Sequence, residues 1–177
     1  MLGLSRWAID DHFITGNILK IGEDELPSDK FKEQQPCFVT LTIAGKLRGC
    51  IGHLEAIQPL YLDIIENSVA AAFNDYRFTP LTKEEFNNID IEISILSKPQ
   101  TLEFSSPDDL LNKLTPGTDG VILRRQKNSA TYLPQVWEEI SDKKEFLSSL
   151  CAKAGLEEHD WEKPGLEVMT YTVEAFS

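Results

Sequence analysis

The chain has 177 residues, of which 41% are hydrophobic, enough to bury one core of ordinary size. Its 17 Lys and Arg residues are outnumbered by 29 Asp and Glu residues, and the formal net charge of -12 disfavours direct binding to nucleic acid, which requires several phosphates to be neutralised. The 3 cysteines include no C-x-x-C pair, so the sequence indicates neither a disulfide framework nor a zinc knuckle.

The sequence carries no sign of export or of a membrane anchor. Residues 1–11 lack a basic segment followed by an apolar run, and no apolar stretch approaches the length that spans a bilayer. We therefore expect a cytoplasmic protein without membrane association, in the reducing compartment that an odd number of cysteines suggests. The length favours a single domain, residues 1–177, with a small lobe appended to it.

The first predicted element is a helix over Ser5–Lys20, where apolar residues recur at roughly helical spacing. Gly22 lies just past it, in a position where glycine often ends a helix. The acidic stretch Glu23–Gln35 shows little periodicity and contains proline, so we expect a surface loop there.

A β-hairpin follows, with strands at Cys37–Ile43 and Leu47–Leu54. A two-residue turn at Gly45–Lys46 would place Leu41 opposite Cys50, on the apolar face, whereas a three-residue loop would place Thr40 opposite Cys50. Because glycine suits the first position of the shorter turn, we expect the pairing with Leu41.

A second helix, over Leu60–Phe73, is apolar nearly all round and should be buried against the sheet on more than one side. A short helix at Thr82–Phe86 precedes the clearest strand, Ile89–Ile95, in which isoleucines alternate with polar residues. Further elements are predicted in chain order: helix 107–114, strands 120–125 and 131–133, helices 134–140 and 143–154, and a closing strand 167–176.

This order of elements predicts the fold class. Strands that mostly do not alternate with helices favour an α+β fold, with a largely antiparallel sheet flanked by helices. We expect the smaller lobe to lie within residues 99–135.

The segment Leu47-Arg48-Gly49-Cys50-Ile51-Gly52 is the most unusual part of the sequence. Two glycines in one strand forfeit packing, and their presence requires a bulge or the close approach of a backbone or a ligand. Strand alternation places Arg48 and Cys50 on one face, where the guanidinium would favour a thiolate. His53 falls on the opposite face, so no pair of nucleophile and base with Cys50 is expected.

Two interpretations of Cys50 remain open. It is either a reactive thiol in a cleft or a buried small hydrophobic residue, beside an Arg48 that a carboxylate fixes in place. Similarly, Asp75 and Arg77 either bind a ligand or pin their loop to the edge of the sheet. His53 and Glu55 have no third ligand at suitable spacing, and we expect no bound metal and no cofactor.

Further motifs extend the pattern beyond this strand: Asp75-Tyr76-Arg77-Phe78-Thr79-Pro80-Leu81, Tyr132-Leu133-Pro134-Gln135-Val136-Trp137 and Leu150-Cys151-Ala152-Lys153-Ala154-Gly155-Leu156. Together with the glycine-containing strand, and in this order, they resemble the AMMECR domain family from about Arg6 to Phe176. Tyr76 and Thr79 depart from the family's usual residues at their positions.

The resemblance implies a two-lobed α+β fold with both termini in the larger lobe and a cleft near the strand that carries Cys50. It implies no reaction, because members of the family have no settled activity. Prokaryotic members are often encoded with, or fused to, Memo-like and radical-SAM proteins, which makes such proteins the expected partners.

We therefore expect a cleft that binds a small anionic ligand or substrate, and whether it is enzymatic stays open. The alternative is a non-catalytic protein-interaction or regulatory module with a Memo-like or radical-SAM partner. The candidate catalytic residues are Cys50, Arg48 and Asp75, and the candidate ligand-binding residues are Arg48, Gly49, Gly52, His53 and Arg77.

Overall fold

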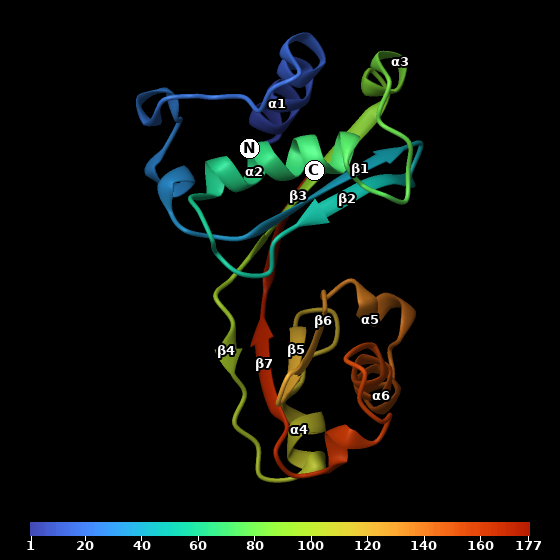
Figure 1. Cartoon of the computed structure of the whole chain (residues 1–177). Coiled ribbons are helices and arrows are strands. Elements are labelled where there is room, and N and C mark those ends of the chain that lie inside the picture. The colour runs from blue at the N-terminus through green and yellow to red at the C-terminus, as the bar shows by residue number, and fades with distance from the viewer. The chain divides into compact units, whose positions relative to one another are not determined.

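The computed structural model describes residues 1–177 and divides them into two compact units (Figure 1). Unit 1 comprises Met1–Leu96 and Glu174–Ser177, and unit 2 comprises Ser97–Val173. Both termini belong to unit 1, as the resemblance implied. Unit 2 extends well beyond the predicted lobe of residues 99–135, because the helices and the strand that follow residue 135 pack onto its sheet.

Unit 1 contains a four-stranded sheet with the strand order β2-β1-β3-β8. Two 3-10 turns, at Glu23–Glu25 and Asp29–Lys32, interrupt the segment predicted as a loop. The elements of this unit are α1 (Leu2–Thr15), β1 (Cys37–Ile43), β2 (Lys46–Gly52), α2 (Leu60–Phe73), α3 (Lys83–Phe86), β3 (Ile89–Leu96) and β8 (Val173–Phe176).

The core of unit 1 lies between its sheet and α2. Val39 and Leu41 on β1 are 0% exposed and face this helix, as do alternate isoleucines of β3. Helix α2 packs on β1 and β2, and α1 packs on α2 in turn (Figure 1). This double cover explains why the sequence of α2 is apolar on more than one side.

Helix α1 differs from its predicted bounds at both ends. It begins at Leu2 and ends at Thr15, where Gly16 adopts a left-handed conformation with φ 70° and its N–H donates to the His12 carbonyl. The apolar residues after Gly16 continue the helical spacing without continuing the helix, and Leu19 reaches the core from a non-helical segment.

The hairpin has the turn one residue earlier than predicted. Ala44 and Gly45 form it with positive φ values of 50° and 75°, and β2 therefore starts at Lys46. Gly49 pairs with Leu41 but Leu47 pairs with Thr42, so that Arg48 forms a β-bulge.

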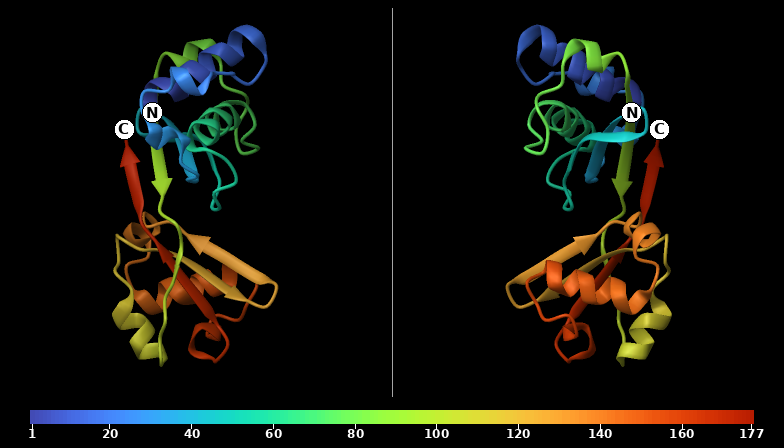
Figure 2. Two further views of the ribbon diagram at one scale, coloured as in Figure 1. Left: turned by 90° about the vertical axis from the view of Figure 1, so that its left-hand side faces the viewer. Right: turned by 90° about the vertical axis from the view of Figure 1, so that its right-hand side faces the viewer.

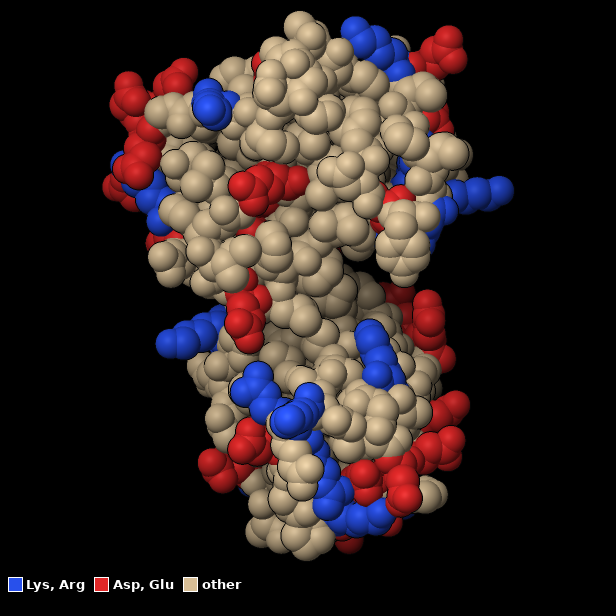
Figure 3. All heavy atoms as spheres, viewed as in Figure 1, with Lys and Arg blue, Asp and Glu red and all other residues tan.

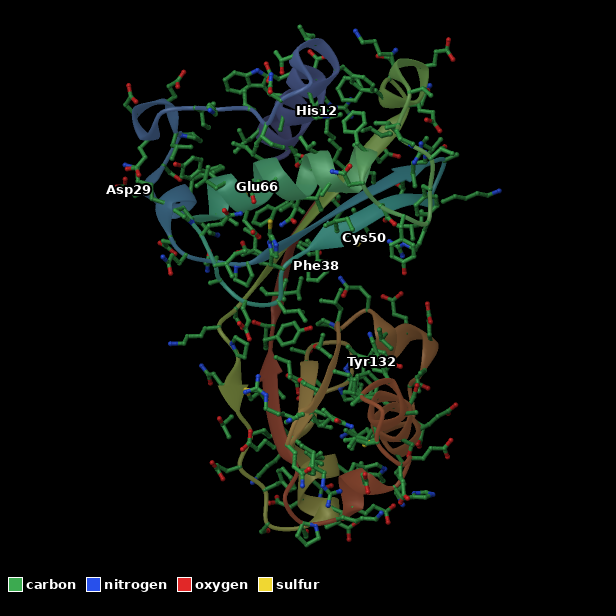
Figure 4. The ribbon with its side chains drawn as sticks, in the orientation of Figure 1. His12, Asp29, Phe38, Cys50, Glu66 and Tyr132 are labelled. Atoms are coloured by element: carbon green, nitrogen blue, oxygen red, sulfur yellow. The ribbon has the colours of Figure 1, made fainter.

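This bulge sets the register on which the surroundings of Cys50 depend. Cys50 lies opposite Thr40, and the expected pairing with Leu41 was wrong. The pairing of Thr40 with Cys50 was expected only for a three-residue loop. Here it results from a two-residue turn together with the extra residue Arg48 in the bulge. As a result, Cys50 faces away from α2 and from the buried side chains of Val39 and Leu41 on β1 (Figure 4).

Unit 2 contains an antiparallel four-stranded sheet with the order β4-β7-β5-β6. Helix α6 contacts β6 (Figure 2). Trp137 stacks on Phe146 with ring centroids 3.5 Å apart. Its elements are β4 (Gln100–Thr101), α4 (Pro107–Lys113), β5 (Gly120–Arg125), β6 (Asn128–Tyr132), α5 (Val136–Glu139), α6 (Lys143–Lys153), a 3-10 turn at Asp160–Glu162, and β7 (Glu167–Tyr171).

The segment predicted as one closing strand is two strands that belong to different sheets. Residues Glu167–Tyr171 pair with β5 in unit 2, whereas Val173–Phe176 form the edge of the sheet in unit 1. The two antiparallel sheets with their flanking helices confirm the predicted α+β class. None of the helices combines the length and the apolar character needed to cross a membrane.

Candidate functional site

The predicted site residues gather along β2, which is an edge strand of the sheet in unit 1. The segment that follows α2 runs along this edge and bonds to it through side chains. The backbone N–H of Cys50 donates to Asp75 Oδ2 at 2.9 Å, and Arg77 Nη2 donates to the Cys50 carbonyl at 3.1 Å. The pair therefore satisfies the backbone groups that a further strand would otherwise bond.

Asp75 and Arg77 also form a two-pronged ion pair with each other. Nε of Arg77 donates to Oδ1 at 2.9 Å and Nη2 donates to Oδ2 at 2.6 Å. The side chain of Asp75 is 2% exposed and that of Arg77 is 41% exposed. The hydrogen bond from Arg77 holds the pKa of the Asp75 carboxyl far below its usual range, with help from the backbone N–H groups of Cys50 and Arg77.

Arg48 is fixed by a second carboxylate. Its Nε and Nη2 donate to the two carboxylate oxygens of Glu85 at 2.9 and 3.0 Å, and Nη2 also donates to the Thr79 carbonyl at 2.9 Å. These bonds lower the pKa of Glu85 to about 2. Arg48 is 9% exposed, and its Nη1 is buried without a hydrogen-bond partner.

The bulge separates Arg48 from the face of Cys50. Without strand alternation at this residue, the guanidinium bonds to Glu85 and Thr79 and makes no hydrogen bond with the thiol. Arg48 therefore has the carboxylate partner that the interpretation of Cys50 as a buried residue required. Cys50 itself is partly exposed rather than buried.

Cys50 differs from the other two cysteines in its exposure. The residue is partly exposed, and its thiol accepts a hydrogen bond from Thr40 Oγ1 at 3.2 Å. Cys37 and Cys151 are 0% exposed, and burial raises the pKa of both thiols. Cys50 is therefore the most exposed of the three cysteines.

The sheet register adds residues that the sequence did not point to. Thr40 pairs with Cys50 on one side and with Glu92 on the other, so the three side chains form a row across β2, β1 and β3. Phe38 on β1 lies on the same face of the hairpin as Cys50, away from α2 (Figure 4). The polar residues of β3 were visible in the alternation, but their position beside Cys50 depends on the bulge.

Both glycines of the strand are explained by packing within unit 1. A Cβ atom at Gly49 would collide with the carbonyl oxygen of Ala71 on α2. At Gly52 it would collide with the ring of Phe38 and would lie 2.5 Å from the Cys37 carbonyl oxygen. These residues allow close approach of protein atoms, and neither is required to leave room for a ligand.

His53 is directed to the other side of the sheet. Its Nδ1 lies 2.6 Å from Asp63 Oδ1 on α2, while Cys50 faces away from that helix. The two residues therefore do not form a nucleophile and base pair, in agreement with the alternation of the strand.

Two cavities lie apart from these residues. One of about 600 Å³ is in unit 2, between residues 101–107 and 161–169, and one of about 700 Å³ is in unit 1 beside Phe31 and Phe176. On the face drawn in Figure 3, Lys and Arg side chains are interspersed with Asp and Glu side chains. The charge of -12 is therefore not gathered into one patch on that face.

Comparison with known proteins gives one family over nearly the whole chain. The AMMECR1 family model matches residues 2–176. A protein of Methanothermobacter thermautotrophicus is 38% identical over 177 residues, which cover 99% of this chain and 91% of the relative. Protein MJ0810 of Methanocaldococcus jannaschii is 37% identical over 172 residues, covering 96% of this chain and 84% of the relative.

A solved structure has the same fold. The crystal structure of the uncharacterized protein PH0010 from Pyrococcus horikoshii superposes with a TM-score of 0.85 at 34% sequence identity. The match covers 98% of this chain and 87% of that one.

Proposed function

The chain belongs to the AMMECR1 family, and we propose that it binds a small anionic ligand beside Cys50, whose thiol is the reactive group of the site. The names of the relatives compared above state no activity. The proposal therefore depends on the geometry of the site.

The observation that carries the proposal is the environment of the Cys50 thiol. Cys50 is the partly exposed cysteine, and its sulfur accepts a hydrogen bond from Thr40 Oγ1 at 3.2 Å. This hydrogen bond orients the sulfur. The backbone of Cys50 is held at both its N–H and its carbonyl by buried or half-buried side chains, which fixes the position of the sulfur.

The anionic character of the ligand is supported by donors that the internal ion pairs leave over. The hydrogen bonds of Arg77 use Nε and Nη2 and leave Nη1 available on a half-exposed side chain. Arg48 Nη1 is also without a partner, but it is buried and lies off the face of Cys50, so Arg77 is the anion-binding residue of this proposal. The guanidinium carbon of Arg77 lies 5.5 Å from the centroid of the Phe78 ring.

The affinity for such a ligand should be modest. Each guanidinium is already neutralised by a carboxylate, so an anion gains individual hydrogen bonds rather than the field of two free charges. We expect dissociation constants on the order of millimolar for a simple anion. Asp75 positions β2 in this proposal and is not an acid or a base, because its low pKa and its occupied oxygens disfavour proton uptake.

Alkylation with a matched pair of reagents tests both parts of the proposal. Iodoacetamide is neutral and iodoacetate is an anion, so the ratio of their rates at one cysteine reports attraction of anions. We expect iodoacetamide to label Cys50 faster than Cys37 or Cys151. We expect Arg77→Gln to lower the ratio of iodoacetate to iodoacetamide at Cys50 several-fold, and inorganic phosphate to slow iodoacetate in the unmutated chain.

The controls separate charge from loosening of the loop. A loosened loop in Arg77→Gln would raise both rates and leave their ratio unchanged, and Arg124→Gln removes one exposed charge from unit 2. If Cys50 is labelled no faster than Cys151, the reactive thiol is ruled out. If the ratio is the same in the unmutated chain and in Arg77→Gln, the anion site is ruled out.

One observation favours a second function, that of a protein-interaction module. Tyr76 is 93% exposed, although Asp75 and Arg77 on either side of it are pinned to β2. A rigidly held, exposed aromatic side chain is typical of a contact that anchors a protein partner. With a purified Memo-like protein as the partner, Tyr76→Ala should abolish capture and Cys50→Ser should not. Equal capture by Tyr76→Ala and the unmutated chain would rule out this contact.

A further inference from the structure

A second group of polar residues joins the end of β2 to α2, on the side of the sheet opposite to Cys50. His53 follows β2 directly, and its backbone N–H donates to the Cys37 carbonyl at 3.1 Å, which continues the pairing of the hairpin by one residue. The imidazole Nδ1 lies 2.6 Å from Asp63 Oδ1. The ring is therefore held both from its backbone and from one ring nitrogen.

Asp63 is buried, and both oxygens of its carboxyl group take part in hydrogen bonds with neighbouring residues. Its side chain is 1% exposed, and Oδ2 accepts the backbone N–H of Cys37 at 2.8 Å. Gln58 Nε2 adds a longer contact to Oδ1, at 3.3 Å. These hydrogen bonds hold the carboxyl group of Asp63 in a fixed orientation.

The geometry decides which nitrogen of His53 carries a proton. The carboxyl oxygens of Asp63 accept hydrogen bonds from Cys37 and Gln58, so we assign Nδ1 of His53 as the donor to Oδ1, which leaves the lone pair on Nε2. Asn67 Nδ2 also lies near Nδ1, at 3.4 Å, but Nδ1 cannot accept from it while donating to Asp63, and the contact of 2.6 Å is the stronger one. The side chain of His53 is 36% exposed, which leaves the ring open to solutes.

From this arrangement we propose that His53 and Asp63 form a proton-transfer site separate from Cys50. Nε2 of His53 takes the proton from a hydroxyl group or a water molecule. For an ester ligand, the O–H bond breaks, an N–H bond forms at Nε2, and the oxygen bonds to the carbonyl carbon while the carbonyl π pair moves to its own oxygen. When that pair returns, the C–O bond to the leaving group breaks, the leaving group takes the bonding pair, and the proton on Nε2 passes to it or to water. Asp63 stabilises the resulting imidazolium and keeps the ring in the required tautomer. Asp63 is thus a positioning residue, and His53 is the base.

The surroundings define the class of ligand. Two acidic residues of α2 bond to Gln58: the buried Asp63 at 3.3 Å, and Glu66, on the exposed side of the helix, at 2.8 Å (Figure 4). Cys37 is buried, and burial raises the pKa of its thiol, so it does not supply the nucleophile. A site with this negative charge takes an uncharged or cationic ligand, in contrast to the anion proposed beside Cys50.

Hydrolysis of p-nitrophenyl acetate, an uncharged ester, tests the proposal. The reaction is followed by the release of p-nitrophenolate, on protein whose accessible thiols have first been blocked with iodoacetamide, so that Cys50 contributes nothing whether or not it is reactive. We expect His53→Gln to lose most of the hydrolysis in excess of buffer, at least a fivefold fall. His159→Gln removes an exposed histidine whose side chain is 72% exposed, and this variant should keep the unmutated rate. Equal rates for His53→Gln and the unmutated chain would overturn the proposal.

Two measurements on the full chain guard against a misfolded variant. Diethyl pyrocarbonate should modify His53 faster than the more exposed His159, and slower modification of His53 would contradict an activated Nε2. Nitrogen-15 NMR should find neutral His53 protonated at Nδ1. Asp63→Asn should shift the proton toward Nε2 and slow both the modification and the hydrolysis, whereas a merely structural contact would leave the hydrolysis unchanged.

Discussion

The carboxylate of Asp75 accepts the backbone N–H of Cys50 at 2.9 Å, so a side chain takes the place of a neighbouring strand at this edge of the sheet. The hydrogen bond ties the loop after α2 to the strand that carries Cys50. It also places the carboxylate of Asp75, whose pKa is lowered, at the point where the edge of the sheet would otherwise be open to another chain.

Acid should weaken the protein through Asp75. Because its pKa is lower in the folded chain than the unfolded value of about 3.9, the carboxylate stabilises the fold above that value and loses its contribution as the pH falls toward the folded pKa. Asp75→Asn should lower the free energy of unfolding at pH 7 by about 1–3 kcal/mol. It should also flatten the dependence on pH below about 4.

Urea unfolding between pH 2 and pH 7 measures this effect. Asp10→Asn, which changes an exposed carboxylate, serves as the control. A slope below pH 4 that is the same in Asp75→Asn and in the control would contradict the prediction.

Gly49→Ala should destabilise unit 1, because the added methyl group meets the carbonyl oxygen of Ala71 on α2. Overpacking of this kind costs about 1–3 kcal/mol, and more where the neighbour is backbone that cannot move aside. Gly3→Ala is the matched control, since nothing lies within 4 Å of its Cβ and alanine favours the helix α1 by about 1 kcal/mol. Thermal unfolding should therefore show shifts of opposite sign, and a neutral Gly49→Ala would mean that α2 does not approach β2 so closely.

Arg48→Lys should cost stability although the charge is kept. A lysine ammonium cannot bond both oxygens of Glu85 and the Thr79 carbonyl in the fixed geometry that the guanidinium provides. We expect a loss of about 1–3 kcal/mol in the free energy of unfolding, against almost no change for Arg124→Lys on the exposed side of β5. Equal midpoints of urea unfolding for the two variants would show that Arg48 acts as a simple charge.

Thr40→Val should slow the alkylation of Cys50 by iodoacetamide at neutral pH. The hydroxyl of Thr40 donates to Cys50 Sγ, and loss of this hydrogen bond should reduce the rate by a few-fold, about 1 kcal/mol. Thr40→Ser should restore the rate. Thr42→Val, two residues along the same strand, should leave it unchanged, and a slowing as large as that of Thr40→Val would point to the strand rather than to the hydroxyl.

Much of unit 1 follows from local patterns in the sequence. Helix α2 and strand β1 have the predicted bounds Leu60–Phe73 and Cys37–Ile43, because a continuous apolar run and a run of β-branched residues leave little choice. The bulge at Arg48 follows no local pattern in the sequence. It lies next to Gly49, where α2 packs closely on the strand. The division of residues 167–176 between two sheets is also a tertiary choice, and the periodicity of that segment gives no sign of it.

The candidate site also has features that the sequence predicts and features that depend on the tertiary structure. Asp75 and Arg77 were expected to bind a ligand or to pin the loop, and their bonds to Cys50 are of the second kind. Thr40 was recognised only as an alternative partner for Cys50, because its position beside the thiol needs a register that the turn residues alone do not determine. Asp63 was not singled out in the sequence, because nothing in the pattern of α2 distinguishes it from the other acidic residue of that helix, Glu66.

Strand β8 completes the sheet of unit 1 although it is synthesised after unit 2. Unit 1 is completed by Glu174–Ser177, which leave the ribosome only after all of unit 2, and the ends of unit 2 are tied by hydrogen bonds between Ser97 and Thr172 at 2.9 Å. During translation the edge of β3 stays bare while more than seventy residues emerge and fold, roughly four to fifteen seconds at ordinary elongation rates. The nascent chain is therefore exposed to mispairing at β3 through that interval, and the final residues end it.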